Sequence, residues 1–240
     1  MLFRSIIMNQ IKILLWDLDG TINDFLAMEN YAIKKGFDRM NLGKCTDEMV
    51  SRYSQINISY WEKLEKCEMK KDQILVDRFK DFFAEYGLPE QNAVVFNRNY
   101  QLDLGDKLVF IDGALEVLQK IKESKKIRQF VVTNGLVANQ KRKLEGQELK
   151  PIFEYAFISD EVGFEKPNIE FFNAVFQKIG DIPKNQVMIV GDSLTSDIKG
   201  GNNAGIKTCW FNSHKKKNNK GVQVDYEISE LRQLPKILCI

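Results

Sequence analysis

The stretch Ile13-Leu-Leu-Trp-Asp-Leu-Asp-Gly-Thr-Ile22 joins an apolar run to two carboxylates and a glycine. The segment from Ile11 to Trp16 is too apolar for a surface element and is stopped by Asp-Leu-Asp-Gly, so it predicts a buried strand. Asp17 and Asp19 are then expected at the carboxyl end of this strand. Open α/β sheets bind ligands at that end of their strands. The stretch therefore predicts an α/β fold with a ligand site at these two acids.

The spacing of the two acids creates an electrostatic problem. Alternate residues of a strand face the same way, so a regular strand would set the carboxylates of Asp17 and Asp19 side by side, where they repel. A bound metal cation, or a turn that redirects one acid, would relieve the repulsion. The alternative is a strand that simply ends in a polar Asx turn, and Asp-x-Asp-Gly alone leaves both interpretations open.

Two further segments carry polar groups at positions where a phosphate could bind. Phe130-Val-Val-Thr-Asn-Gly135 is a short β-branched strand that ends in the hydroxyl of Thr133 and the amide of Asn134. A hydroxyl with free backbone N–H groups can hold a phosphate oxygen, although it can equally cap a helix. Lys166 precedes a proline and a predicted helix start. Taken singly, this lysine is interpreted as a solvated surface charge.

The segment Val187-Met-Ile-Val-Gly-Asp-Ser-Leu-Thr-Ser-Asp197 is an apolar strand followed by two more acids. Asp192 is expected at the tip of the strand, and Asp197 near the start of the next helix. Both could be helix caps without any catalytic role.

In this order and at these separations, the four segments resemble the haloacid dehalogenase superfamily of phosphohydrolases. Residues that match its four motifs are Asp17-Leu-Asp-Gly-Thr21, Thr133, Lys166-Pro167, and Gly191-Asp192 with Asp197. Two longer stretches, 159–167 and 191–212, are also similar to a subgroup of pyrimidine nucleotidases, which release phosphate from nucleoside monophosphates.

The resemblance implies a catalytic centre that attacks phosphorus with a carboxylate. A phosphate monoester dianion repels an incoming carboxylate, so attack by Asp17 needs positive charge around the phosphate oxygens. Mg²⁺ and Lys166 would supply that charge. The family pattern has Mg²⁺ held by the Asp17 carboxylate, the Asp19 backbone carbonyl and the Asp192 carboxylate, with phosphate and water completing an octahedral oxygen shell. Asp197 would orient the metal site from behind these ligands or through water.

The remaining motif residues receive roles in proton transfer and phosphate binding from the same resemblance. Asp19 would protonate the leaving ester oxygen and then deprotonate the water that hydrolyses the aspartyl-phosphate. Its side chain must therefore point away from the metal. Thr133 and the backbone after it, at Asn134, would bind phosphate oxygens together with Lys166.

The pattern of periodicity along the chain predicts an inserted helical module. After Thr21 the period becomes helical, Gly87-Leu-Pro89 interrupts it, and an amphipathic helix is expected at 114–122. Strands are then expected at 127–133, 155–159, 187–191 and 207–211, alternating with helices. We expect a doubly wound, Rossmann-like parallel sheet formed by 1–23 and 104–240, with an all-helical cap at 24–103. The cap aromatics Tyr53, Tyr60 and Trp61 are interpreted as core residues rather than base-stacking groups.

Composition and charge are those of an ordinary soluble globular protein. The chain has 240 residues, 44% of them hydrophobic, which suits one large core or a core with an inserted module. The net charge of +2 gives no field suited to nucleic acid, and the run at 215–217 with Lys220 is interpreted as a solvated loop. We expect a monomer or weak homodimer.

Cysteine usage and the absence of long apolar segments indicate a cytoplasmic protein. Cys45, Cys67, Cys209 and Cys239 form no Cys-x-x-Cys pair, and His214 is the only histidine, so reduced thiols are the simplest account. The start at 1–8 is too short for a secretion signal and can be an extension ahead of Met8. No segment of the sequence approaches the roughly 18 apolar residues of a membrane span.

The function predicted from the sequence is a Mg²⁺-dependent phosphomonoester hydrolase that acts through an aspartyl-phosphate. The subgroup resemblance implies a 5'-nucleotidase for pyrimidine nucleoside monophosphates such as UMP, dUMP and dTMP. A phosphatase or phosphomutase for a sugar phosphate or another small metabolite is the alternative. A dehalogenase is disfavoured because Asp19 would have no role, and a non-catalytic binding protein is disfavoured because all the chemical groups are present.

Overall fold

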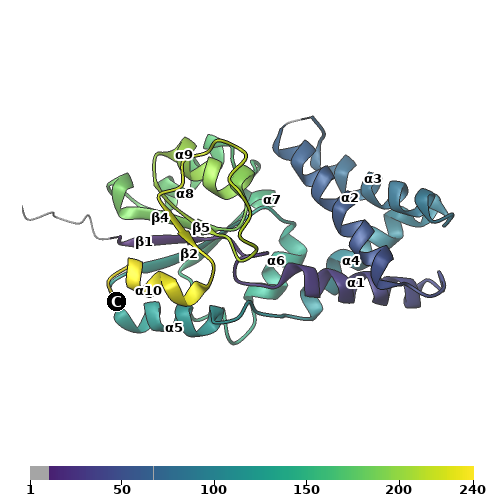
Figure 1. Cartoon of the computed structure of the whole chain (residues 1–240), viewed down its shortest axis with the longest axis horizontal. Coiled ribbons are helices and arrows are strands. Elements are labelled where there is room, and N and C mark those ends of the chain that lie inside the picture. Colours follow the sequence, from purple (N-terminus) through teal and green to yellow (C-terminus); the bar gives the residue numbers. More distant parts are fainter. Residues whose placement is uncertain (1–10, 67) are drawn as a thin grey trace, which may run out of the picture.

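One parallel sheet forms the centre of the larger lobe of the computed structural model, which describes residues 11–66 and 68–240 (Figure 1). Its strand order is β3-β2-β1-β4-β5-β6. The bounds are β1 Ile13–Trp16, β2 Arg128–Thr133, β3 Tyr155–Ile158, β4 Val187–Gly191, β5 Lys207–Phe211 and β6 Tyr226–Ile228. The start at 1–8 and Cys67 lie outside the described residues.

The order of the strands places β1 between β2 and β4, where the direction of winding reverses. Ligands of open α/β sheets bind at this switch point, beyond the carboxyl ends of the strands. The predicted doubly wound parallel sheet is therefore confirmed, with Asp17 and Asp192 following the two strands that flank the switch point.

Helices cover both faces of the sheet because alternate residues of β1 point to opposite sides. Leu14 and Trp16 pack with α5 and α10 on one face, while Ile13 and Leu15 pack with α8 and α9 on the other (Figure 1). Helices and turns of this lobe are α5 Ala114–Ser124, α6 Val137–Leu144, α7 Ser159–Val162, α8 Ile169–Ile179, η2 Lys184–Gln186, η3 Leu194–Ile198, α9 Lys199–Ala204, η4 Leu231–Gln233 and α10 Leu234–Ile237.

The predicted strands differ from the observed ones by one or two residues at their ends, since β2 begins at Arg128 rather than 127 and β3 ends at Ile158 rather than 159. β1 begins at Ile13 rather than Ile11, and β6 was not predicted. Tyr226 and Glu227 of β6 are exposed at the edge of the sheet, so this strand carries no apolar run that periodicity could detect.

A helical lobe with its own core is inserted between β1 and α5 (Figure 1). Its elements are α1 Phe25–Arg39, α2 Asp47–Glu65, α3 Lys71–Glu85, η1 Glu90–Asn92 and α4 Ala93–Asp106. Tyr53 and Tyr60 are buried in this core, as expected, whereas Trp61 is only half-buried. The helix α4 continues beyond the expected boundary at 103, and the division into two domains stays a prediction.

Two further observations concern the cysteines and the possibility of a membrane-spanning helix. Cys45, Cys209 and Cys239 are free. Among the helices of the described residues, none combines the length and the apolar character needed to cross a membrane.

Aromatic packing holds the helical lobe together, and it predicts the effect of a truncation. Phe79 is fully buried, with ring centroids 4.7 Å from Tyr53 and 5.0 Å from Phe96. Phe79→Ala should lower the free energy of unfolding by about 3–5 kcal/mol, measured by urea denaturation. Leu102→Ala, on the exposed side of α4, should change it by less than about 0.5 kcal/mol. Equal losses in the two variants would contradict this packing.

Candidate active site

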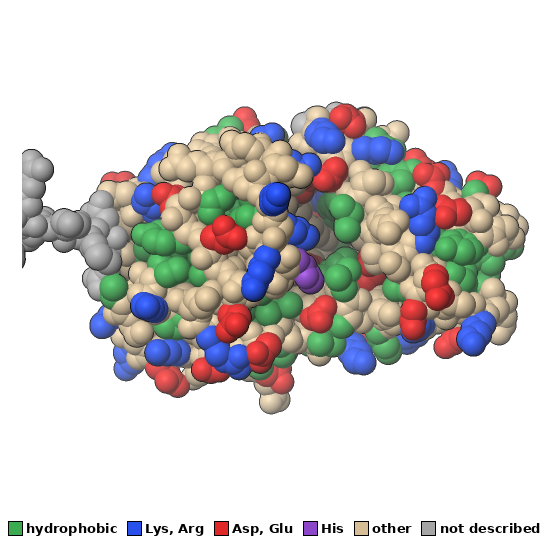
Figure 2. Space-filling model, in the orientation of Figure 1, with side chains coloured by type: hydrophobic (Ala, Val, Ile, Leu, Met, Phe, Trp, Pro, Cys, Tyr) green, Lys and Arg blue, Asp and Glu red, His purple; other side chains and the backbone are tan. Residues whose placement is uncertain are grey.

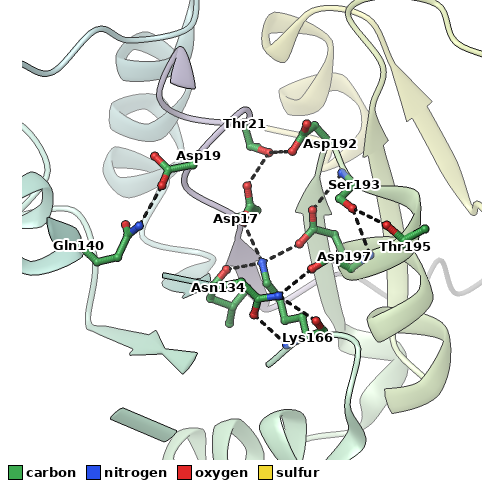
Figure 3. A network of polar contacts seen from close by, with 12 residues as sticks. Asp17, Asp19, Thr21, Asn134, Gln140, Lys166, Asp192, Ser193, Thr195 and Asp197 are labelled. Atoms are coloured by element: carbon green, nitrogen blue, oxygen red, sulfur yellow. Dashed lines mark hydrogen bonds and ion pairs between the residues drawn. The ribbon is translucent and has the colours of Figure 1, made fainter. Parts of the chain in front are cut away.

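A turn at the end of β1 separates the two acids of Asp-Leu-Asp. The backbone N–H groups of Ile22 and Asn23 both donate to the carbonyl of Leu18, at 3.0 and 2.8 Å, and Gly20 adopts a φ of +95°. As a result, Asp17 faces the tip of β4 while Asp19 faces helix α6 (Figure 3). The repulsion expected for a regular strand is thus relieved by a redirecting turn.

Lys166 holds Asp17 and Asp197 together in the interior. Its Nζ lies 2.8 Å from Oδ1 of Asp17 and 2.6 Å from Oδ1 of Asp197, and it donates to the carbonyl of Val132 at 2.7 Å (Figure 3). Because an ammonium has three donors, all of them have partners. Lys166 is 1% exposed, so the interpretation of this lysine as a surface charge is wrong.

Burial shapes the charge states of this group. Burial raises the pKa of Asp17 well above its usual range, the negative charge of Asp197 adds to the rise, and Lys166 offsets part of it. For Lys166, burial alone would lower the pKa, but the charges of Asp17 and Asp197 raise it. The single positive charge of Lys166 therefore does not balance the negative charges of Asp17 and Asp197.

Asp192 adds a third carboxylate from the tip of β4. Thr21 bridges it to Asp17, since the Thr21 hydroxyl lies 3.1 Å from Oδ2 of Asp17 and 3.5 Å from Oδ1 of Asp192. Asp192 is exposed, yet the protein atoms packed around its carboxylate and the charge of Asp197 raise its pKa as well.

Asp197 approaches the strand tip closely, and this depends on a glycine. It lies in η3, and its Oδ2 accepts from the backbone N–H of Ser193 at 3.1 Å. A Cβ on Gly191 would come within 2.3 Å of Cγ of Asp197, so any larger residue would displace the acid. Both carboxylate oxygens of Asp197 thus already have protein partners.

Asp17, Asp192 and Asp197 could together hold a metal ion. Each offers one carboxylate oxygen, and these atoms lie within 4.8 Å of one another. Carboxylate oxygens are the ligands that hard divalent cations prefer. Burial, and after it the charge of Asp197, raise the pKa of Asp17 and Asp192, and a cation would oppose both effects. The residues therefore fit such a group.

Thr133 and Asn134 complete the floor of the same cavity at the tip of β2. The side-chain amide of Asn134 donates to the carbonyl of Lys166 at 2.8 Å and its oxygen accepts from the Lys166 N–H at 2.8 Å. This side chain therefore fixes the loop that carries Lys166. The structure thus brings the predicted site residues to one end of the sheet, with the Asp19 side chain turned to the side.

Sequence reasoning assigned no role to five side chains that line the cavity or contact its acids. Trp61 and Glu65 come from the helical lobe, Thr21 from the turn after β1, and Gln140 and Lys143 from α6. Burial raises the pKa of Glu65 to about 7. Thr21 lies within the first motif of the sequence. The other four side chains lie in segments whose sequence pattern indicated no functional role.

A cleft between the two lobes leads to Asp19 and Asp192. The helical lobe contributes Leu26, Ser54, Asn57 and Ile58, and the loop after β5 contributes His214 and Lys216. Figure 2 shows the hollow between the lobes with the histidine at its edge. The loop at 215–217 is exposed as expected, but Lys216 also lines this cleft.

Comparisons with known proteins agree with this arrangement. A family model described as haloacid dehalogenase-like hydrolase matches residues 14–211. The chain is 36% identical over 233 residues to the HAD-hydrolase YfnB of Bacillus subtilis, covering 97% of both. A crystal structure of YfnB bound to magnesium has a TM-score of 0.90 to this chain at 35% identity, covering 96% of this chain and 100% of YfnB.

Two further relatives are named for an activity. The pyrimidine 5'-nucleotidase PynA of Streptococcus pneumoniae is 32% identical over 223 residues, covering 93% of each chain. The pyrimidine 5'-nucleotidase YjjG of Escherichia coli is 29% identical over 194 residues, covering 81% of this chain and 84% of YjjG.

The convergence of three carboxylates predicts that a divalent cation stabilises the fold. Because the pKa of Asp17 is raised on folding, its favourable contribution is present at low pH and is lost as the pH rises through the raised value. Metal binding removes this penalty. Mg²⁺ should therefore raise the melting temperature, and by more at about pH 8 than at about pH 5. No rise at either pH would contradict a metal site, and Asp192→Asn should reduce the rise.

Proposed function

The chain belongs to the haloacid dehalogenase-like hydrolases, and on that premise we propose that it is a Mg²⁺-dependent phosphatase acting through an aspartyl-phosphate on Asp17. The observation that carries the proposal is the pair of separated acids at the end of β1. Asp17 is fixed against Lys166 beside the other carboxylates, while Asp19 is turned aside. Nucleophilic attack and proton transfer each require one of these placements.

Asp17 is proposed as the nucleophile. Lys166 fixes one carboxylate oxygen of Asp17, and Thr21 fixes the other. This restricts the carboxylate to one orientation toward the cavity. Lys166 also places a positive charge at the floor of the cavity, where the phosphate oxygens would bind.

Thr133 and Asn134 are proposed to bind the phosphate, and Lys166, whose three donors already have partners, is proposed to attract it through its charge. The Asn134 amide is engaged with the Lys166 backbone, so the phosphate contact falls to the Thr133 hydroxyl and to the backbone N–H of Asn134. These groups lie at the tip of β2, next to Asp17 at the tip of β1.

Mg²⁺ is proposed to be held by the carboxylates of Asp17 and Asp192 and the backbone carbonyl of Asp19. When bound, it supplies positive charge that attracts the phosphate and offsets the charge of the acids. Asp197, whose two oxygens are occupied by Lys166 and Ser193, is proposed to orient these groups from behind.

Asp19 is proposed as the general acid and base. The Asp19 carboxyl would give a proton to the leaving ester oxygen and then take one from the water that attacks the aspartyl-phosphate. Its side chain borders both the cavity and the interlobe cleft, so it can meet the leaving group at their junction.

The substrate is proposed to be a pyrimidine nucleoside monophosphate. PynA and YjjG are named for this activity. The cleft supports it, because exposed Leu26 and Ile58 can cover the flat faces of a base. A sugar phosphate or another small metabolite is the alternative. The cytoplasmic location and the monomer or weak homodimer stay predictions.

Substrate preference is tested by the hydrolysis of a panel of phosphate monoesters with Mg²⁺. We expect kcat/KM for UMP, dUMP and dTMP to exceed that for purine nucleotides and sugar phosphates, because the leaving group must fit the cleft. Far better turnover of sugar phosphates would refute the nucleotidase proposal and leave the phosphatase proposal standing. Ile58→Ala should lower kcat/KM for nucleotides more than for p-nitrophenyl phosphate.

Variants of Asp17 and Asp19 distinguish the roles proposed for these two acids. Asp17→Asn should abolish turnover, because an amide does not attack phosphorus and is not a charged metal ligand. Asp19→Asn should leave KM nearly unchanged and lower kcat by about 10²–10⁴-fold for nucleotides. The loss should be smaller for p-nitrophenyl phosphate, whose leaving group needs little protonation. Near-normal turnover by Asp17→Asn would contradict the assignment of the nucleophile.

A further inference from the structure

The two acids of the first motif have separate buried lysines. Lys166 contacts Asp17, whereas Lys143 of α6 contacts Asp19 from the opposite side of the turn. Nζ of Lys143 lies 2.7 Å from Oδ1 of Asp19 and 2.8 Å from Oδ2. Gln140, one turn earlier on the same helix, donates to Oδ2 at 2.9 Å (Figure 3). Both carboxylate oxygens of Asp19 therefore accept hydrogen bonds from side chains of α6.

The complete burial of Lys143 indicates a specific role for its ion pair with Asp19. Its side chain is 0% exposed, and Asp19 is the only acid among the described residues with which it forms an ion pair. A completely buried ammonium is unfavourable unless it is paired, and a hydrophobic residue of similar size is often at least as stabilising. Stability of α6 alone therefore does not account for a lysine at this position.

The helix that carries Lys143 is held by both lobes. The backbone N–H of Val137 donates to Oδ2 of Asp160 at 3.1 Å in the sheet lobe. Asn139 donates to Oε1 of Gln101 at 2.6 Å, and Arg142 pairs with Asp106, both on α4. A side chain on such a fixed element can orient its partner accurately.

We propose that Lys143, assisted by Gln140, is a positioning residue that holds the Asp19 carboxyl where it can act as acid and base. The proposal rests on the phosphatase function given above. Lys143 does not line the cavity beside Asp17, and it acts only through Asp19.

The reaction explains why one orientation has to be maintained. In the first step an oxygen of Asp17 bonds to phosphorus, the ester P–O bond breaks, and the proton of Asp19 passes to the leaving oxygen. In the second step water attacks phosphorus, its proton passes to the Asp19 carboxylate, and the bond to Asp17 breaks to release phosphate. Both steps require Asp19 at the same place, and small misplacements of such groups lower rates strongly.

The test compares leaving groups in variants of Lys143. Lys143→Met should lower kcat for dUMP and for phenyl phosphate by about 10–100-fold, with KM nearly unchanged. The loss in kcat/KM, which reports the first step, should be smaller for p-nitrophenyl phosphate than for the other two esters. Lys141→Met, which removes an exposed lysine of the same helix, should match the unaltered protein on all three esters. Equal losses on good and poor leaving groups in folded Lys143→Met would overturn the proposal.

A double variant keeps the test independent of stability. Asp19→Asn with Lys143→Met removes both charges, so neither is left unpaired, and folding is checked by its melting temperature. If Lys143 acts through Asp19, this variant should have the same kcat as Asp19→Asn alone. Multiplied losses would show an independent role and overturn the proposal. If the unaltered protein hydrolyses none of the three esters, the phosphatase proposal itself fails.

Discussion

The ion pairs of Lys166 are the interaction on which the arrangement of the strand tips depends. Two carboxylates from the ends of β1 and β4 and a third from η3 converge here, and the buried ammonium of Lys166 contacts two of the three. Breaking such a buried pair leaves an uncompensated charge and typically costs about 3–5 kcal/mol. Asn134 holds the loop that delivers this lysine, and Gly191 leaves the space that Asp197 fills. Segments far apart in the sequence are thereby tied to one point.

A single ammonium does not neutralise three carboxylates, and this imbalance accounts for the chemistry proposed at the site. The remaining negative charge attracts a divalent cation, and the cation with Lys166 would then attract a phosphate dianion. Had Asp19 stayed beside Asp17, it would have added a fourth negative charge. The turn at Gly20 instead delivers Asp19 to Lys143, so the two acids lie in different electrostatic surroundings. Groups with opposite tasks in a reaction generally need such separation.

The sheet and the acids at its tips could be predicted because each is marked by a local pattern. The apolar runs of β1, β2 and β4 end in polar residues, and parallel strands bring their carboxyl ends to one edge. Lys143 could not be found in this way, because a lysine on a short polar helix resembles any surface lysine until the packing of α6 is known. Trp61 and Glu65 were missed for a related reason, since the direction in which α2 faces depends on how the helical lobe meets the sheet.

The helix α6 contacts both lobes. Its start is bonded to the sheet lobe, its outer face to α4, and its inner face to Asp19. A movement of the helical lobe would therefore displace Asp19, the proposed acid, more directly than Asp17. Asp17 is anchored to the strands through Lys166. In this geometry Asp17, the proposed nucleophile, is fixed within the sheet lobe, while Asp19, the proposed proton-transfer group, lies where the two lobes meet. The position of the Asp19 carboxyl therefore depends on how the two lobes meet, whereas the position of Asp17 depends on the sheet lobe alone.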